Sequence, residues 1–415
     1  MKPKSLFAAA ALLLTSLITN QAHGSVWATS ASWSPAYEQR YQEWVRSSWT
    51  KNVFAEAGPL SGVKVDCADA VYTMRLLFSY NNGLPFAVKD PSSSRNVISN
   101  EMKRFDSIAA GDARLRAFAQ YLYGMLGTST LADDSYPVAI GRETIHSGVF
   151  IKTDKATHHS WTVHDVDRNG VPFLLYASRP AKTVLLERHG YPSAGFLWGQ
   201  QDLQGRQIDA NLQTAGDVAS GVGFRMYRYP SDLQKPVWQV PGYSLDQYQI
   251  QRLTYARSIQ RALQITQESP GEHAARLLKE ACAEATERIA SVQDAIKAMS
   301  RSSSSCFSAS EYDDLSTPSR DSRAVAVFQD LVSTYRSNSS SIGGTTGARI
   351  AAIVANRDDG SYCPLRIGSG TTMTLGEAVN FALKDRWSSN PNDTLLARWG
   401  RERSPSSRAA SCPTY

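Results

Sequence analysis

This chain has no long apolar segment after residue 24, no cluster of basic residues and no internal repeat. The first two absences argue against membrane-spanning and nucleic-acid-binding proteins. After residue 24 there is no stretch of about 18 consecutive apolar residues, so stable membrane insertion is not expected. The formal net charge is only +6 and the basic residues are scattered, which argues against nucleic-acid binding. With 42% hydrophobic and 20% charged residues in 415 positions, the composition is that of a globular protein with room for two domains.

The first 24 residues have the pattern of a secretory signal peptide. Lys2 and Lys4 supply a basic start, and Leu6–Ile18 is an apolar run interrupted only by Ser and Thr. Ala22-His23-Gly24, with small residues at 22 and 24, suits cleavage before Ser25. The apolar run of about 13 residues is short for a bilayer, so we expect cleavage rather than anchoring. The mature protein is then exported, to the periplasm or outside the cell.

Cysteines are few, and their distribution is informative. Of the five, Cys282, Cys306, Cys363 and Cys412 lie in the C-terminal half, where export would allow them to pair. Three pairings are possible, and local connections favour Cys282 with Cys306 and Cys363 with Cys412. Cys67 remains alone in the N-terminal half. A lone thiol in an exported protein is a nucleophile, a buried apolar residue or half of a bridge to another chain.

The chain divides by pattern into residues 25–243 and a later region at 244–415. In the first region, hydrophobic periodicity predicts helices at 35–48 and 99–125 and strands at 137–140, 148–152, 160–166 and 171–177. In the second region it predicts helices at 244–267, 271–299, 319–336 and 375–385. The fold class expected is α+β, with a mostly helical, disulfide-linked C-terminal region.

Asp66 is followed by a segment that predicts a helix with Cys67 in its first turn. The apolar positions that recur at helical spacing are Ala70, Val71, Met74, Leu77 and Phe78. Asp66 is a good N-cap, and residues 81–83 (Asn-Asn-Gly) form a typical helix end. The free N–H groups and the dipole at a helix start favour a thiolate and can stabilise an oxyanion. The alternative is a cysteine that simply fills a small site at the helix start.

A histidine pair precedes the strand at 160–166. Residues 167–170 (Asp-Arg-Asn-Gly) predict a tight turn, and 171–177 is the returning strand. Strand alternation places His159 on one face, together with Trp161, and His158 on the other. We take His159 as the candidate general base for Cys67.

The residue that orients His159 should come from the returning strand. Asp165 shares its face but lies six positions along an extended strand, roughly 20 Å away. A four-residue loop places Ser178 opposite His159, whereas a two-residue turn places Pro180 there and leaves Ser178 diagonal. Ser178, or a backbone carbonyl near it, is therefore the expected third member of the site.

Metal binding is a weaker interpretation of the same hairpin. Residues 165–170 match the first half of an EF-hand calcium loop, but the twelfth position is Tyr176 rather than Glu. His158, His159 and His164 alternate between two faces and lack a fourth ligand at zinc spacing. A plain hairpin turn is favoured, and no cofactor or metal is expected.

These two motifs resemble the transglutaminase-like cysteine enzymes, and the papain-like NlpC-type cell-wall peptidases have a similar order and layout. The resemblance spans about residues 60 to 180 and is carried by Cys67 opening its helix, Ala70, Leu76-Leu77, Gly83-Leu84-Pro85 and His159-Ser160-Trp161. It implies a cysteine-bearing helix packed on an antiparallel sheet, within residues 25–243. Transglutaminase-type members carry Asp where this chain has Ser178, which puts the third triad member in doubt.

The favoured function is acyl transfer by a Cys67–His159 dyad or a triad with Ser178, hydrolysing amide bonds in a peptide, protein or cell-wall peptide. An amine in place of water would make the enzyme a cross-linker. A degenerate, non-catalytic domain that binds peptides or cell wall is the alternative from another class. A structural envelope protein with a buried Cys67 is the third.

Overall fold

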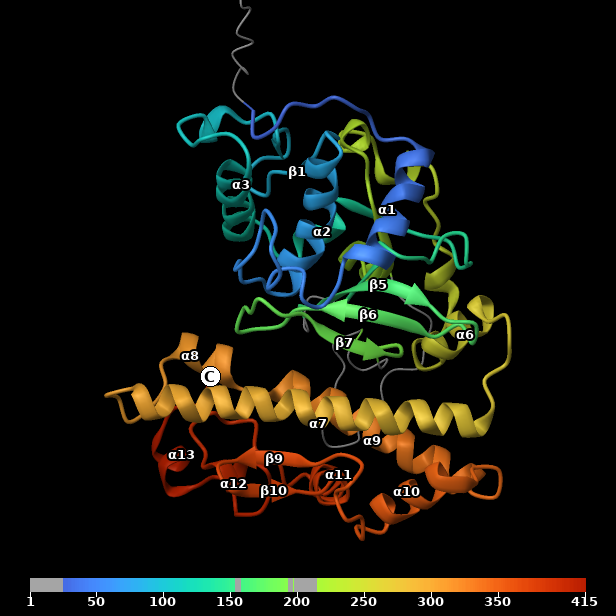
Figure 1. The fold of residues 1–415 in the computed structure, drawn as a ribbon, viewed down its shortest axis with the longest axis vertical. Helices are drawn as coiled ribbons and strands as arrows, with labels where there is room; N and C mark the ends of the chain where they lie inside the picture. Colours follow the sequence, from blue (N-terminus) through green and yellow to red (C-terminus); the bar gives the residue numbers. More distant parts are fainter. Residues whose placement is uncertain (1–24, 154–157, 193–196, 198–214) are drawn as a thin grey trace, which may run out of the picture.

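A computed structural model describes residues 25–153, 158–192, 197 and 215–415 (Figure 1). The signal-peptide prediction for residues 1–24 lies outside these. The helices of the N-terminal half are α1 (Pro35–Ser48), α2 (Cys67–Asn81), α3 (Asp112–Met125), α5 (Ala215–Ser220) and the 3₁₀ turns η1 (Lys103–Phe105), η2 (Thr130–Ala132), η3 (Pro230–Asp232) and η4 (Val237–Gln239). The strands are β1 (Ala87–Lys89), β2 (Val97–Ser99), β3 (Ser135–Pro137), β4 (Phe150–Lys152), β5 (Ser160–Val166), β6 (Pro172–Tyr176), β7 (Leu186–His189) and β8 (Gly223–Tyr227).

The C-terminal half is mostly helical. It contains η5 (Asp246–Gln249), η6 (Arg252–Thr254), α6 (Tyr255–Leu263), α7 (Pro270–Arg301), α8 (Ala309–Leu315), α9 (Pro318–Asn338), α10 (Gly344–Val354), β9 (Leu365–Gly368), β10 (Thr371–Met373), α11 (Leu375–Leu383), α12 (Leu395–Arg398) and α13 (Ser407–Ser411). The molecule is therefore mixed α+β with a helical C-terminal region, as the sequence predicts.

Six antiparallel strands form the main sheet, in the order β3-β8-β4-β5-β6-β7. The β5–β6 hairpin pairs Val166 with Pro172 at the turn and Thr162 with Leu175 further on, with a register shift between Val163 and Asp165. The hairpin that the sequence predicts here is confirmed.

The two faces of this sheet belong to different cores. Leu175 and Ala177 join the apolar core around α2, whereas Trp161, Leu174 and Tyr176 belong to a second core. Alternation along the strands produces this division. Figure 1 shows α1 and α2 on one side of β5 and β6, and the long helix α7 on the other.

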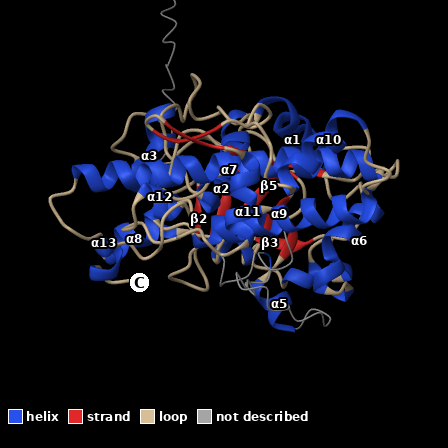
Figure 2. Ribbon diagram, turned by 90° about the horizontal axis from the view of Figure 1, so that it is seen from below, coloured by secondary structure: helices blue, strands red, loops and turns tan. Residues whose placement is uncertain are grey.

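The long helix α7 organises the C-terminal half. Ser269 and Glu272 form a capping box at its start, and Pro270 occupies the first turn. Leu277 from α7 and Phe328 from α9 are buried in a third core that also includes residues of α10 and α11. Seen from below in Figure 2, helices make up most of the surface, with the strands between them.

Two of the predicted helices are not α-helical over their N-terminal parts. Only Asp112–Met125 of the predicted helix at 99–125 is α-helical, because Gly111 at φ +95° starts a new segment after η1. The predicted helix at 244–267 is two 3₁₀ turns followed by α6. Apolar spacing over short segments does not separate a 3.0-residue period from a 3.6-residue one. The other predicted helices are confirmed as α1, α2, α7, α9 and α11.

The predicted disulfide pairing is also wrong. The bridges are Cys282–Cys363 and Cys306–Cys412. α7 continues from Cys282 to Arg301, 19 residues (301 − 282), or about 28 Å at 1.5 Å per residue, which carries Cys306 away from Cys282. The two bridges are compatible with an exported protein. In the part of the chain that the structure describes, no helix is long and apolar enough to cross a bilayer.

Candidate functional site

Cys67 is the first residue of α2, and the predicted N-cap Asp66 is confirmed as part of a capping box with Asp69. The Asp66 carboxylate accepts the N–H groups of Ala68 and Asp69 at 3.1 and 3.2 Å. The Asp69 carboxylate in turn accepts the Asp66 N–H at 3.1 Å. These bonds satisfy N–H groups that a helix start leaves free, and they fix the orientation of the first turn. The sulfur is consequently held at a defined place.

The Cys67 sulfur contacts two groups from other segments. Its Sγ lies 3.3 Å from Thr128 Oγ1, and it donates to the backbone carbonyl of His158 at 3.5 Å. The Thr128 hydroxyl also donates to the His158 carbonyl, at 3.3 Å. The thiol, the hydroxyl and the carbonyl therefore form one small cluster. Cys67 is the one cysteine of the five outside a disulfide.

The electrostatic environment keeps the sulfur protonated. Burial, followed by the negative charge of Asp66, raises the pKa of the Cys67 thiol to about 11. Hydrogen bonds from Thr128 and the Ala68 N–H act in the opposite direction but are weaker. The sequence-based expectation of a thiolate from the helix dipole is therefore not met in this conformation. Any attack by Cys67 requires a base that removes the proton.

His159 lies on the opposite face of the sheet from the Cys67 backbone. The hydroxyl of the adjacent Ser160 donates to the Cys67 carbonyl at 3.0 Å, so the Ser160 face is the α2 face. The His159 ring lies 4.4 Å from that of Trp161 and 5.5 Å from that of Tyr176, measured between centroids. Burial, and then the nearby Arg323, lower the pKa of His159 well below its usual value. His159 is thus neutral, and the structure shows no hydrogen bond between its ring and the Cys67 sulfur.

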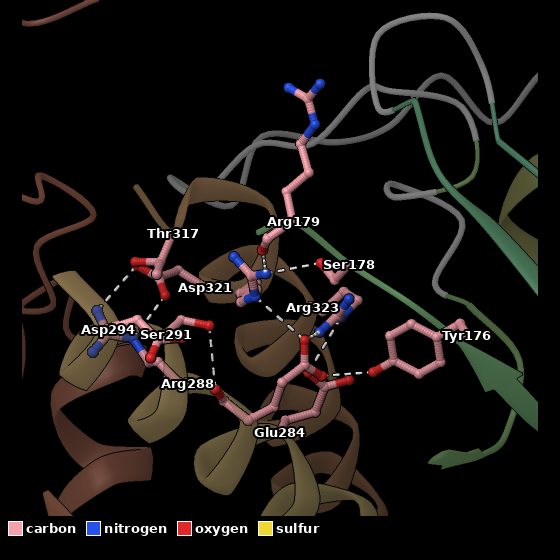
Figure 3. A network of polar contacts seen from close by, with 12 residues as sticks. Tyr176, Ser178, Arg179, Glu284, Arg288, Ser291, Asp294, Thr317, Asp321 and Arg323 are labelled. Atoms are coloured by element: carbon pink, nitrogen blue, oxygen red, sulfur yellow. Dashed lines mark hydrogen bonds and ion pairs between the residues drawn. The ribbon is translucent and has the colours of Figure 1, made fainter. Parts of the chain in front are cut away.

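Ser178 is held by the C-terminal half. Arg320 Nη2 donates to Ser178 Oγ at 2.8 Å and also to the Arg179 carbonyl (Figure 3). If the β5–β6 register is continued beyond the Thr162–Leu175 pair, Ser178 lies opposite His159. This is the pairing expected for the four-residue loop. The Ser178 hydroxyl nevertheless accepts from Arg320, so its position is set by α9.

A cavity of about 560 Å³ lies in front of the sulfur. Its walls come from the start of α2, residues 126–129 after α3, both His158 and His159 at the start of β5, and Ser178 with Arg179. Tyr123 of α3 and residues of α8, α9 and the link between them (313, 314, 316–320 and 323) supply the remaining wall. Cys67 and His159 therefore border one space from different directions.

Arg179 links the two halves across the rim of this cavity. Its Nη1 lies 2.9 Å from an Asp313 carboxylate oxygen, and its Nε lies 4.0 Å from Asp66. The Arg179 side chain is 62% exposed, so these pairs are screened and contribute little stability. The two pairs place the Arg179 guanidinium between Asp66, the N-cap of α2, and Asp313 of α8.

Sequence reasoning did not identify Thr128, the His158 carbonyl or the α8–α9 wall. Thr128 is 61 residues from Cys67, and neither motif points to it. The α8–α9 wall depends on how the two halves pack, which periodicity does not encode. Alternation separates Ser160 from His159, but the sequence does not show that α2 covers the Ser160 face.

Among the described residues, no group of three or more His, Cys, Asp or Glu side chains is arranged to hold a metal ion. No protein-family model, no curated protein and no solved structure matches this chain. The chemistry of the site is therefore interpreted from its own residues.

Replacing Thr128 by Val should slow the reaction of Cys67 with iodoacetamide about five-fold near neutral pH. Valine keeps the shape but removes the hydroxyl whose hydrogen bond lowers the pKa of the thiol, a loss of about 1 kcal/mol. Thr128→Ser retains the hydroxyl and serves as the control. A Thr128→Val protein that reacts as fast as wild type would show that the 3.3 Å contact does not influence the sulfur.

Proposed function

We propose that this protein is an exported cysteine-dependent acyl-transfer enzyme that hydrolyses amide bonds in a peptide, protein or cell-wall peptide. The observation that supports it most is the place of Cys67. It is the one thiol left free by two disulfides, and it stands at a capped helix start facing a cavity of about 560 Å³. Export accounts for both the disulfides and the expected signal peptide.

In the proposed reaction the Cys67 sulfur attacks the carbonyl carbon of the scissile amide. An imidazole of the His158–His159 pair takes the thiol proton and later gives it to the leaving amine. Because the pKa of Cys67 is raised to about 11, the proton must leave as the sulfur attacks. A water molecule, deprotonated by the same imidazole, then cleaves the thioester and regenerates the thiol.

The polar lining of the cavity suits a peptide. Ser178, Arg179 and the carboxylates of Asp66, Asp313 and Asp314 border it, so hydrogen-bonding groups surround the position of the scissile bond. We assign the mature protein to the periplasm or the cell exterior. Recognition of cell-wall peptides remains part of the same proposal.

The experiment is an acylation and alkylation assay on the mature protein with Cys67→Ser as the control. p-Nitrophenyl acetate should acylate Cys67 and release p-nitrophenol, and iodoacetamide should label the same residue across pH 4 to 9. Mass spectrometry locates both adducts. If neither reagent modifies Cys67 while the protein is folded, the enzymatic proposal is wrong.

A non-catalytic, peptide- or cell-wall-binding role is the second candidate. It is favoured by the absence of a hydrogen bond between Cys67 and His159 in the described structure, and by the Arg320 contact that holds Ser178. Under this alternative, peptidoglycan pull-down would be equal for wild type and Cys67→Ser, and no acyl adduct would form.

A further inference from the structure

We propose that His158, rather than its neighbour His159, is the imidazole that accepts the proton of Cys67. This inference rests on the proposed cysteine chemistry and names the base within it. It is carried by three observations of the structure: the packing of His159 in the second core, the closeness of the His158 backbone to the sulfur, and the backbone conformation of His158.

The sheet faces separate the two histidines. The Ser160 hydroxyl bonds the Cys67 carbonyl at 3.0 Å, and Leu175, which pairs with Thr162, lies in the core around α2. Ser160 and Thr162 of β5 therefore face α2. His158 precedes β5 and has φ +43°, so it is placed by its contact with the sulfur and not by strand alternation. His159 instead lies among aromatic rings of the second core, where Trp161 is fully buried. To reach the sulfur, the His159 side chain would have to leave that packing.

His158 is already beside the sulfur. Its carbonyl oxygen is 3.5 Å from Cys67 Sγ. The carbonyl oxygen and Cα of one residue are about 2.4 Å apart, which puts the His158 Cα within about 6 Å of the sulfur. An imidazole side chain covers that span by rotation about its two side-chain dihedrals. The His158 side chain is exposed and borders the same cavity as the sulfur.

The backbone of His158 is strained in a way that fits a functional position. Its φ is +43°, in the left-handed region that residues other than glycine rarely adopt. Such conformations persist only where surrounding contacts hold them. Here the Thr128 hydroxyl and the Cys67 thiol both donate to the His158 carbonyl, at 3.3 and 3.5 Å. Two side chains of the site thus bind the backbone of this residue.

The proton balance of the step is simple. As the Cys67 S–H bond breaks, the proton passes to a ring nitrogen of neutral His158 and the sulfur forms a bond to the carbonyl carbon. The resulting imidazolium gives its proton to the leaving group as the C–N or C–O bond breaks. His158 is then neutral again and can accept a proton from the water that hydrolyses the thioester.

The test compares the rate of Cys67 acylation by p-nitrophenyl acetate at pH 7 in wild type, His158→Ala and His159→Asn. We expect His158→Ala to lower the rate on the order of 100-fold, the size of a lost general base. Added imidazole should restore part of this rate, because the vacated position opens to the cavity. Imidazole also cleaves the ester by itself, so the rescue is the rate in excess of a His158→Ala/Cys67→Ser control. His159→Asn should lower the rate much less than His158→Ala, and added imidazole should not raise it, because the His159 ring is packed against Trp161 and Tyr176. Circular dichroism checks that each variant is folded.

The outcomes separate this inference from the proposed function. Loss of rate in His159→Asn but not in His158→Ala overturns the assignment while leaving the cysteine chemistry standing. Equal loss in both folded variants without rescue by imidazole also overturns it, because the effect is then structural. No acylation of wild-type Cys67 would remove the proposed function itself, and the inference with it.

Discussion

Replacing Arg323 by Met should lower the free energy of unfolding by about 3 kcal/mol, because it leaves buried carboxylates with too little positive charge. Arg323 lies in α9 and is 2% exposed, with Nε 3.2 Å from Glu284 and Nη2 2.7 Å from Glu287. Arg188 on β7 and Arg320 on α9 complete the network, at 2.7 Å from Glu284 and 3.3 Å from Glu287. Urea unfolding measures the loss.

Lys182→Met is the matched control for this prediction. The Lys182–Asp294 pair also joins the two halves, at 2.7 Å, but its side chains are 46% and 39% exposed. Exposed pairs contribute less than about 1 kcal/mol, so Lys182→Met should change stability little. If the two substitutions lower the free energy of unfolding by the same amount, burial does not explain the contribution of the network to stability.

The cost of Arg323→Met should depend on pH. Burial acts to raise the pKa of Glu287, but Arg323 and Arg320 outweigh it and hold that pKa at about 2. A carboxylate with a depressed pKa stabilises the fold above its unfolded pKa of about 4.3, and this contribution is lost as the pH falls towards 2. The difference in the free energy of unfolding between wild type and Arg323→Met should therefore be largest above about pH 5 and smaller at pH 3. A difference independent of pH would indicate that the loss comes from packing alone.

This network also determines the geometry of the candidate site. Tyr176, whose ring lies beside His159, donates to Glu287 at 2.5 Å. Arg320 connects the same Glu287 to Ser178 on the cavity wall. The α8–α9 wall is thus attached to the β5–β6 hairpin through buried charges. The C-terminal half, which carries no motif of its own, shapes the space in front of Cys67.

Much of the local structure could be predicted from the sequence because its signals are local. Asp66 followed three residues later by Asp69 specifies the start of α2, and the turn at residues 167–170 specifies the β5–β6 hairpin. Ser269 with Glu272 does the same for α7. These contacts join residues close in sequence, and patterns of that kind are visible without a fold.

The site could be predicted only in part, because its decisive contacts join distant segments. The sequence does identify Cys67 as the unpaired cysteine. It also sorts the two histidines onto opposite faces of a strand, but the face that α2 covers is decided by tertiary packing. The Thr128 contact and the Arg320–Ser178 bond span 61 and 142 residues. Neither leaves a signal in residue spacing.

Removing the Cys282–Cys363 bridge with Cys282→Ala and Cys363→Ala should lower the stability of the C-terminal half by about 4 kcal/mol. The bridge closes a loop across 81 positions, and a cross-link of that span removes about 4.5 kcal/mol of unfolded-chain entropy. Cys363 is 2% exposed and packs in the core shared by α7, α9 and α11. Urea unfolding of the doubly substituted protein measures the change.

The matched control is removal of the other bridge, Cys306–Cys412, which closes a longer loop of 106 positions. Loop length alone predicts an equal or slightly larger loss for this bridge. Cys306 and Cys412, however, lie outside the core of the C-terminal half, and Cys412 directly follows the short helix α13, so release of this bridge should free only the tail around α13 and open locally. Hydrogen exchange should then show lost protection across α9 and α11 without the Cys282–Cys363 bridge, and in the tail alone without the Cys306–Cys412 bridge. Equal losses throughout both proteins would mean that chain entropy, rather than position in the core, determines the contribution of each disulfide.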